Sequence, residues 1–545
     1  LEEHAAELAE HFSQSTDRVE LTKAVSYGEL ASQRALAVYA YGEAARHLEQ
    51  ALAVQEVLDP DDTAKRCDLL LMLGEALLPA GDPLRVIEAV APEALALAEN
   101  LRDDSRSSRA CQAAVEGFWL QYGPRGRATA EFRRWAGDAD RLASPGSLER
   151  VYADIALSRA AFWEDRELAW DLAERALALA HQLGDAQAIR SCAGQMLGGA
   201  WPFHHAGARL RLAEEFALQP AAGAGATAFS IRSGAFNVFL IWGQRERAEQ
   251  MAREARAIAD RTRHISALVQ ASALEIQLLA LSGRLEEAME AGEALVRRGQ
   301  ELGAPGLARD FARRATFWPS LHLGRAEGTL VAAEQEPVDL AGVLSGGGRG
   351  LARAHLGQWD AAREDLDRLR EVWRKRGRAV GWSSATQPLW LAAAVLVSDR
   401  RLVELLRDSL APAAGMLSQL FPTRIARHLG AASALLGETD KARGYYQQAI
   451  EICEKVRFRP ELALTRLELA ELMLGEANSN QPSAISTPPR APERKRGGLT
   501  ADKLKADASR AEALAHLDFA IAEFREMKMQ PSLERALRHK DVLKA

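Results

Sequence analysis

Apolar positions along this chain recur with helical spacing, and a glycine or aspartate interrupts the pattern about every 40 residues. The apolar runs on either side of each interruption predict two amphipathic helices joined by a tight turn. A period of this length is typical of a solenoid, because one helical hairpin cannot bury its apolar face alone and stacks on its neighbours. The predicted turn residues are Gly81, Gly123, Asp165, Gly207, Gly243, Gly283, Gly324, Gly357, Asp399, Gly437 and Gly475.

The segment 424–456 shows one such unit. The run RIARHLGAASALL places Ile425 and Leu429 four residues apart and ends at Gly437, where glycine permits the turn. Thr439 or Asp440 can cap the next helix, which the amphipathic run KARGYYQQAIEICEKV then forms.

This unit resembles the tetratricopeptide (TPR) family. Leu429 and Gly430, followed by Ala442, Tyr446 and Ala449, match the family's Leu-Gly, central Ala, aromatic and second Ala. The resemblance implies an all-α, right-handed α-solenoid of about twelve TPR-like helical hairpins. The second-helix signature also occurs as Ala44, Leu48 and Ala51; Ala169, Ala173 and Ala176; Ala248, Ala252 and Ala255; and Ala513, Leu517 and Ala520.

Segments 4–52 and 510–543 resemble the two ends of a more particular helical-repeat region. That region follows the ATPase module in bacterial signal-transduction ATPases, which include large ATP-binding LuxR-type transcription regulators and ATPase–TPR nucleotide cyclases. The resemblance implies a non-catalytic, cytoplasmic sensor or interaction region with covalently linked ATPase and output modules. Its concave groove would bind a protein or peptide partner or a small effector. The alternative is a free-standing scaffold without a ligand switch.

The pattern divides the chain into three parts. Residues 1–475 are predicted to form the solenoid, and residues 509–545 the last repeat helix and a capping helix. Residues 476–508 are rich in proline, serine and charge, which predicts a disordered insertion that cannot bury enough apolar surface to order itself. The chain begins at Leu1 rather than methionine, which suggests the interior of a longer protein.

Composition excludes several classes of protein. The net charge of -6 predicts no general contact with nucleic acid, and no apolar run approaches the ~18 residues of a membrane span. Four scattered cysteines form no CxxC pair, which indicates a reducing compartment. No GxxxxGKS/T, HExxH or GxSxG motif occurs, so we expect no catalytic residue, cofactor or metal.

Aromatic, amide and imidazole side chains gather near the ends of predicted first helices. In the TPR family the first helices line the concave groove, and counting from the turn residues assigns several of these side chains to groove positions. The same register places Trp119 and Phe239 at packing positions. Filling of gaps between stacked helices remains the alternative for the large aromatics. The groove candidates are Phe162, Trp163, Trp201, His204, His205, Asn237, Gln277, Trp318 and His355.

The pair His204–His205 has two possible roles. Adjacent side chains on one helix are expected to diverge, and no carboxylate or cysteine lies at the i+4 position to complete a metal shell. A surface or hydrogen-bonded pair is therefore favoured over a metal site.

Overall fold

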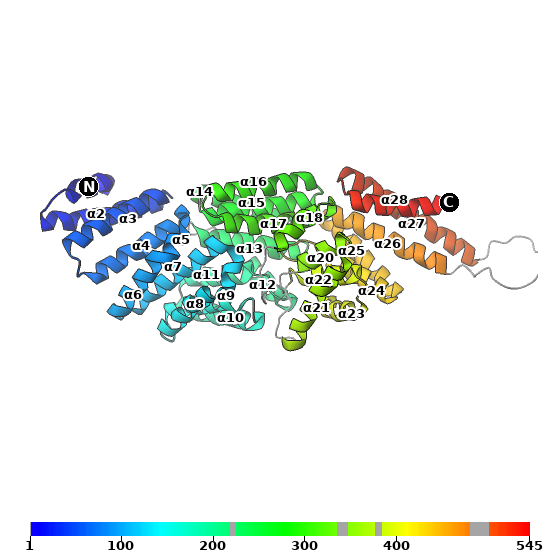
Figure 1. Cartoon of the computed structure of the whole chain (residues 1–545), viewed down its shortest axis with the longest axis horizontal. Helices are drawn as coiled ribbons and strands as arrows, with labels where there is room; N and C mark the ends of the chain where they lie inside the picture. Colours follow the sequence, from blue (N-terminus) through cyan, green and yellow to red (C-terminus); the bar gives the residue numbers. More distant parts are fainter. Residues whose placement is uncertain (1, 218–224, 335–346, 377–383, 480–500, 545) are drawn as a thin grey trace, which may run out of the picture.

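The protein is an all-α solenoid, as the periodicity predicts. The computed structural model describes residues 2–217, 225–334, 347–376, 384–479 and 501–544. In these ranges β-structure is limited to one isolated antiparallel bridge between Leu417 and Arg424. The molecule is elongated, with the N-terminal helices (blue) near one end and the C-terminal helices (red) near the other (Figure 1). Over the described part of the chain, none of them combines the length and apolarity that crossing a membrane requires.

Within the described ranges the helices pair in chain order into twelve antiparallel hairpins, preceded by α1 (Ala5–Ser13) and closed by α28 (Gln530–Lys544). The pairs are α2 (Arg18–Ala37) with α3 (Tyr41–Leu58), α4 (Thr63–Ala80) with α6 (Ala91–Leu101), α7 (Asp104–Tyr122) with α8 (Ala130–Leu142), α9 (Leu148–Ala161) with α10 (Arg166–Leu183), α11 (Ala186–Gly198) with α12 (Ala206–Ala217), α13 (Ala226–Ile241) with α14 (Arg245–Thr262), α15 (Ile265–Leu281) with α16 (Leu285–Glu301), α17 (Pro305–His322) with α18 (Ala326–Glu334), α20 (Gly347–His355) with α21 (Trp359–Arg376), α22 (Gln387–Leu396) with α23 (Arg400–Leu410), α24 (Ile425–Leu436) with α25 (Thr439–Val456), and α26 (Arg459–Ser479) with α27 (Ala501–Glu526).

Most of the predicted turn residues lie where a helix ends or begins. Gly437 adopts the left-handed conformation that ends α24, and Asp399 caps α23 by accepting a hydrogen bond from the Leu402 amide. Gly207 is the second residue of α12 and so lies at the start of a helix, whereas the turn prediction for Gly475 is wrong because this residue lies inside α26. A single glycine inside a helix costs only about 1 kcal/mol, so strong helix formers on both sides override it.

The predicted insertion 476–508 is shorter at both ends than expected. Helix α26 continues to Ser479 and α27 already begins at Ala501. Residues 480–500, the remainder of that prediction, lie outside the described residues.

The TPR-like signature residues form the contact between α24 and α25. Leu429, Ala442 and Ala449 are fully buried, and the Tyr446 ring covers Gly430. A Cβ atom on Gly430 would lie 2.6 Å from Cε1 of Tyr446, which is too close for two carbon atoms. The small residue is therefore what lets the two helices approach.

We expect Gly430→Ala to destabilise the protein by about 1–3 kcal/mol, because the added methyl overpacks a filled interface. Gly444 on the exposed side of α25 has no atom within 4 Å of such a methyl, so Gly444→Ala is the matched control. The control should stabilise the helix by up to about 1 kcal/mol. Urea unfolding followed by circular dichroism measures both, and a stabilising Gly430→Ala would contradict the packing described.

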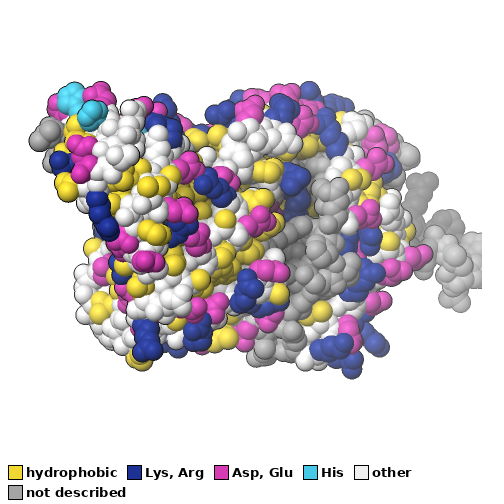
Figure 2. Space-filling view, turned by 60° about the vertical axis from the view of Figure 1, so that its left-hand side comes forward, with side chains coloured by type: hydrophobic (Ala, Val, Ile, Leu, Met, Phe, Trp, Pro, Cys, Tyr) yellow, Lys and Arg dark blue, Asp and Glu magenta, His cyan; other side chains and the backbone are white. Residues whose placement is uncertain are grey.

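Hairpins that lie about 200 residues apart in the sequence touch one another. The Tyr41 hydroxyl donates to the Thr262 carbonyl at 2.9 Å, and Arg209 donates to Oε1 of Gln419 at 2.8 Å. Arg245 donates to the Val456 carbonyl at 2.9 Å. Successive turns of the solenoid are therefore in contact, and its concave side becomes a lumen. Figure 2 shows hydrophobic side chains along a hollow between two raised parts of the surface.

The segment 414–424, here called the lumen loop, crosses this interior between α23 and α24. The Leu417 amide donates to the Ile241 carbonyl at 3.0 Å, and Nε1 of Trp318 donates to the Phe421 carbonyl at 3.3 Å. Hairpins distant in sequence thus hold the loop in place. The loop carries no repeat signature, so the repeat pattern does not predict its position.

Candidate functional site

Two cavities lie in the lumen on either side of the lumen loop. The C-terminal cavity has a volume of about 1020 Å³ and lies among α17, α20, α22, α24, α25, α26 and α28. The N-terminal cavity has a volume of about 540 Å³, and Leu420 and Phe421 of the lumen loop form part of its wall. Both volumes fall in the range of small-molecule sites.

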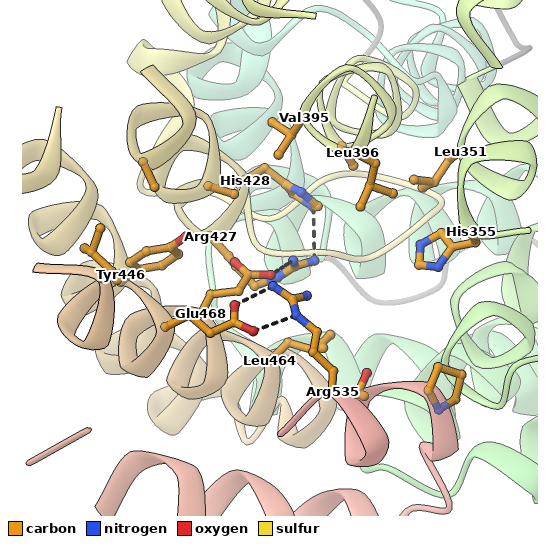
Figure 3. A pocket seen from close by; sticks show the side chains of 18 of the residues that line it. Leu351, His355, Val395, Leu396, Arg427, His428, Tyr446, Leu464, Glu468 and Arg535 are labelled. Carbon is orange, nitrogen blue, oxygen red and sulfur yellow. Dashed lines mark hydrogen bonds and ion pairs between the residues drawn. The ribbon is translucent and has the colours of Figure 1, made fainter. Parts of the chain in front are cut away.

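The C-terminal cavity has one apolar side and one charged side (Figure 3). Leu351 of α20 with Val395 and Leu396 of α22 lie on one side, and Arg427 and Glu468 lie across from them. His355 and Arg535 also reach into the space, from α20 and α28 respectively. Side chains from five hairpins and the final helix therefore meet in one cavity.

A buried ion network forms the floor of this charged side. Arg427 donates to Oε2 of Glu461 and to Oε1 of Glu468, each at 2.8 Å. Glu461 also accepts hydrogen bonds from the Thr423 hydroxyl at 2.6 Å and the Arg424 amide at 3.0 Å. Burial alone would raise the pKa of Glu461, but Arg427 and these hydrogen bonds lower the pKa to about 2. Glu461 is therefore a fixed anion.

Among the described residues, only one of the two carboxylate oxygens of Glu468 has a hydrogen-bond partner. Its Oε1 accepts from Arg427, whereas its Oε2 is buried and has no hydrogen-bond partner among the described residues. Burial raises the pKa of Glu468. A small part of the Glu468 side chain is exposed to the cavity, whereas Oε2 itself is enclosed by protein.

Three histidines line the C-terminal cavity as neutral rings. Burial, with a contribution from Arg427, lowers the pKa of His322 and of His428 to about 3. The His355 ring is exposed to the cavity yet enclosed by protein, and burial together with the nearby Arg427 and Arg535 lowers its pKa to about 4. A neutral imidazole can donate through one nitrogen and accept through the other.

The structure brings six of the nine predicted groove residues to a cavity wall. Phe162, Trp163, Asn237 and Gln277 line the N-terminal cavity, and Trp318 and His355 line the C-terminal cavity.

Trp201 was expected in the groove but lies in the core. Its ring is fully buried, with the rings of Phe162 and Trp170 at centroid distances of 5.2 Å. The register for this repeat was counted from Gly207, whereas α11 already ends at Gly198, so the count was displaced.

Trp119 and Phe239 were both expected in packing positions. Phe239 is buried in the core, whereas Trp119 lines the N-terminal cavity and its ring faces the guanidinium of Arg127 at 4.5 Å. Trp119 also packs against the neighbouring core cluster, edge-to-face with Phe311 at 6.3 Å, so its packing assignment is confirmed and the cavity wall is an additional role.

His204 and His205 face away from both cavities and contact Glu167 of α10. Each places Nε2 at 3.1 Å from Oε2 of Glu167. The expected divergence of the two rings is wrong, because both rings turn toward the same oxygen of Glu167 and their centroids lie 4.0 Å apart; the pair forms the end of the 3-10 helix η4 (Phe203–His205). Two imidazoles and a carboxylate could hold a metal ion. Two hydrogen bonds to one carboxylate oxygen account for the same arrangement without an ion.

The sequence pattern does not single out the residues of the ion network. Arg427, Glu461 and Glu468 stand in ordinary amphipathic helices, where charged residues usually face solvent. The one available signal was the spacing of Glu461 and Glu468, which puts two acids two turns apart on one helix face.

The fold and cavities define the chain as an α-helical repeat protein with an internal lumen. No family model matches the chain, and no curated protein matches it. Among solved structures it is similar to a chain of the APC/C hetero-tetramer Cut9–Hcn1, with 13% sequence identity and a TM-score of 0.41. That match covers 94% of this chain and 96% of the other. The fold assignment therefore rests on the helices and contacts described above.

Proposed function

We propose that this chain is a sensor region that binds a small polar effector in its C-terminal cavity. The observation that carries the proposal is the C-terminal cavity of about 1020 Å³, in which apolar side chains lie opposite Arg427 and Glu468. A hydroxyl or amino group of a ligand would form a hydrogen bond with the Glu468 carboxylate where this side chain lines the cavity. His355 and Arg535 offer further polar contacts, and the leucines and valine opposite accept the apolar part of the molecule.

Binding at this position would couple distant hairpins. The cavity wall joins α20 and α22 to α26 and α28, which belong to separate units of the solenoid. Each repeat of a solenoid contacts chiefly its neighbours, so fixing the distance across the cavity changes the curvature of the whole. A ligand that prefers one curvature shifts the population toward it.

The sequence resemblance extends the proposal to the sensor region of a larger bacterial signalling ATPase, with ATPase and output modules in the same polypeptide and a cytoplasmic location. The alternative is a free-standing scaffold that binds protein partners. The flanking coding sequence separates the two. A P-loop ATPase encoded upstream in frame supports the sensor, and a start codon immediately before the Leu1 codon supports the scaffold.

We expect a thermal-shift screen of sugars, amino acids and nucleosides to identify a ligand that stabilises the full chain. Glu468→Gln and His355→Ala should each weaken its binding about tenfold, the effect of losing one good hydrogen bond. Trp359→Ala is the control, because Trp359 is an exposed aromatic outside both cavities. A ligand that binds equally to all three variants would contradict the assignment of the site.

A further inference from the structure

The N-terminal cavity concentrates positive charge in a chain whose net charge is -6. The carboxylates in its wall are Glu75 and Glu116. Its arginines come from hairpins that meet across the contact between α7 and α17. They are Arg127, Arg159, Arg166, Arg313 and Arg314.

The carboxylates near these arginines are already engaged. Glu75 pairs with Arg109, outside the cavity wall, at 2.7 Å. Glu116 lies 3.7 Å from Arg159. Asp310 forms ion pairs with two arginines, Arg313 at 3.2 Å and Arg314 at 2.9 Å.

Arg127 has no such partner. It belongs to the 3-10 helix η3 (Gly123–Ala128) and stacks on the Trp119 ring at 4.5 Å. No carboxylate of the described residues pairs with it, and its Nε is buried without a hydrogen bond. Burial lowers the pKa of Arg127, and repulsion from Arg159 and Arg314 lowers it further, against an opposing contribution from Glu116. A buried guanidinium is normally paired, so the cavity is electrostatically incomplete without an anion.

The rest of the wall suits the body of a planar molecule. Trp119, Trp163 and Phe311 supply aromatic surface. Nε2 of Gln195 and Oε1 of Gln277 are buried and have no partner among the described residues, and both residues line the cavity.

We propose that the N-terminal cavity is a second ligand site, which binds a small molecule with a planar apolar body and a carboxylate or phosphate group held by Arg127. The planar guanidinium matches either oxyanion through paired hydrogen bonds. Trp119 already fixes the orientation of this side chain, so little rotamer entropy is lost on binding. The site is separate from the C-terminal cavity, so either cavity can prove not to bind a ligand without affecting the proposal for the other.

Calorimetric titration of the full chain with 2-naphthoate and with its neutral analogue 2-naphthylmethanol tests the proposal. We expect naphthoate to bind at least tenfold more tightly, with an affinity that falls as salt rises. Arg127→Met should abolish the difference between the two probes while leaving naphthylmethanol binding unchanged. It should also raise the thermal midpoint of the free protein, because it removes a repelled cation. Arg297→Met, at an exposed arginine of α16, is the control and should change neither quantity.

Three results would overturn the proposal. They are equal affinities for the two probes, no binding of naphthoate at millimolar concentration, and equal losses in Arg127→Met and Arg297→Met. Glu468→Gln, which alters the C-terminal cavity, should leave naphthoate binding intact. The variant therefore distinguishes failure at one cavity from failure at the other.

Discussion

Replacing Arg427 with methionine is expected to destabilise the chain by about 3–5 kcal/mol, the cost of removing one partner from a buried ion network. Methionine has a similar length but no charge, so Glu461 and Glu468 would remain buried without their shared cation. Both carboxylates are almost inaccessible to water, so solvent cannot replace the lost contacts. Urea unfolding of the full chain, followed at 222 nm, measures the loss.

Two comparisons make this prediction specific. Adding Glu461→Gln to Arg427→Met should restore part of the stability, because the double variant no longer leaves that carboxylate charged. Arg18→Met removes the exposed pair between Arg18 and Asp59 and should have little effect. If the two arginine variants lose the same stability, the buried network does not hold the cavity floor together.

The second large effect is expected from pH. His322 and His428 have a pKa of about 3 in the folded chain, and the ordinary value of 6.5 applies once they are unfolded. Between these values the unfolded chain takes up protons that the folded chain does not. The free energy of unfolding is therefore highest above pH 6.5 and falls as pH decreases toward 3. From pH 7 to pH 5 each histidine should account for a loss of about 2 kcal/mol.

The variant His428→Asn isolates one of these contributions. It should reduce the slope of the free energy of unfolding against pH between pH 7 and pH 5. Near pH 5 this reduction should correspond to about one fewer proton taken up on unfolding. His181→Asn, at an exposed histidine of α10, should leave the dependence unchanged. A parallel pH profile for His428→Asn and the unaltered chain would show that His428 is not held neutral by its surroundings.

Much of the fold could be predicted because it is locally encoded. Gly437 ends a helix through its own backbone conformation, and the close approach of Gly430 to Tyr446 depends on residues sixteen positions apart. Errors arose where a local signal was weak. Gly475 resembles the other turn glycines, yet its helix continues because both flanks favour helix.

The candidate site was only partly predictable. The register counted from turn residues brought Trp163 and Trp318 to cavity walls, because first helices do face the lumen. It misplaced Trp201, and it gave no reason to select Arg427 or Arg127. An arginine in an amphipathic helix or a short turn has the same sequence signature whether it faces solvent or a cavity.

The sequence by itself determined the helical hairpins, their period and the small residues at their interfaces, because these follow from helix periodicity, capping and contacts within one repeat. Only the tertiary structure decided that the concave side is enclosed. That outcome depends on contacts such as Arg245 with Val456 and Arg209 with Gln419, which join residues about 200 positions apart. Small rotations between successive repeats add up over five hairpins, and no local pattern records their sum. The same accumulated rotation brings the arginines together at the N-terminal cavity. It also brings the acidic residues together at the C-terminal cavity.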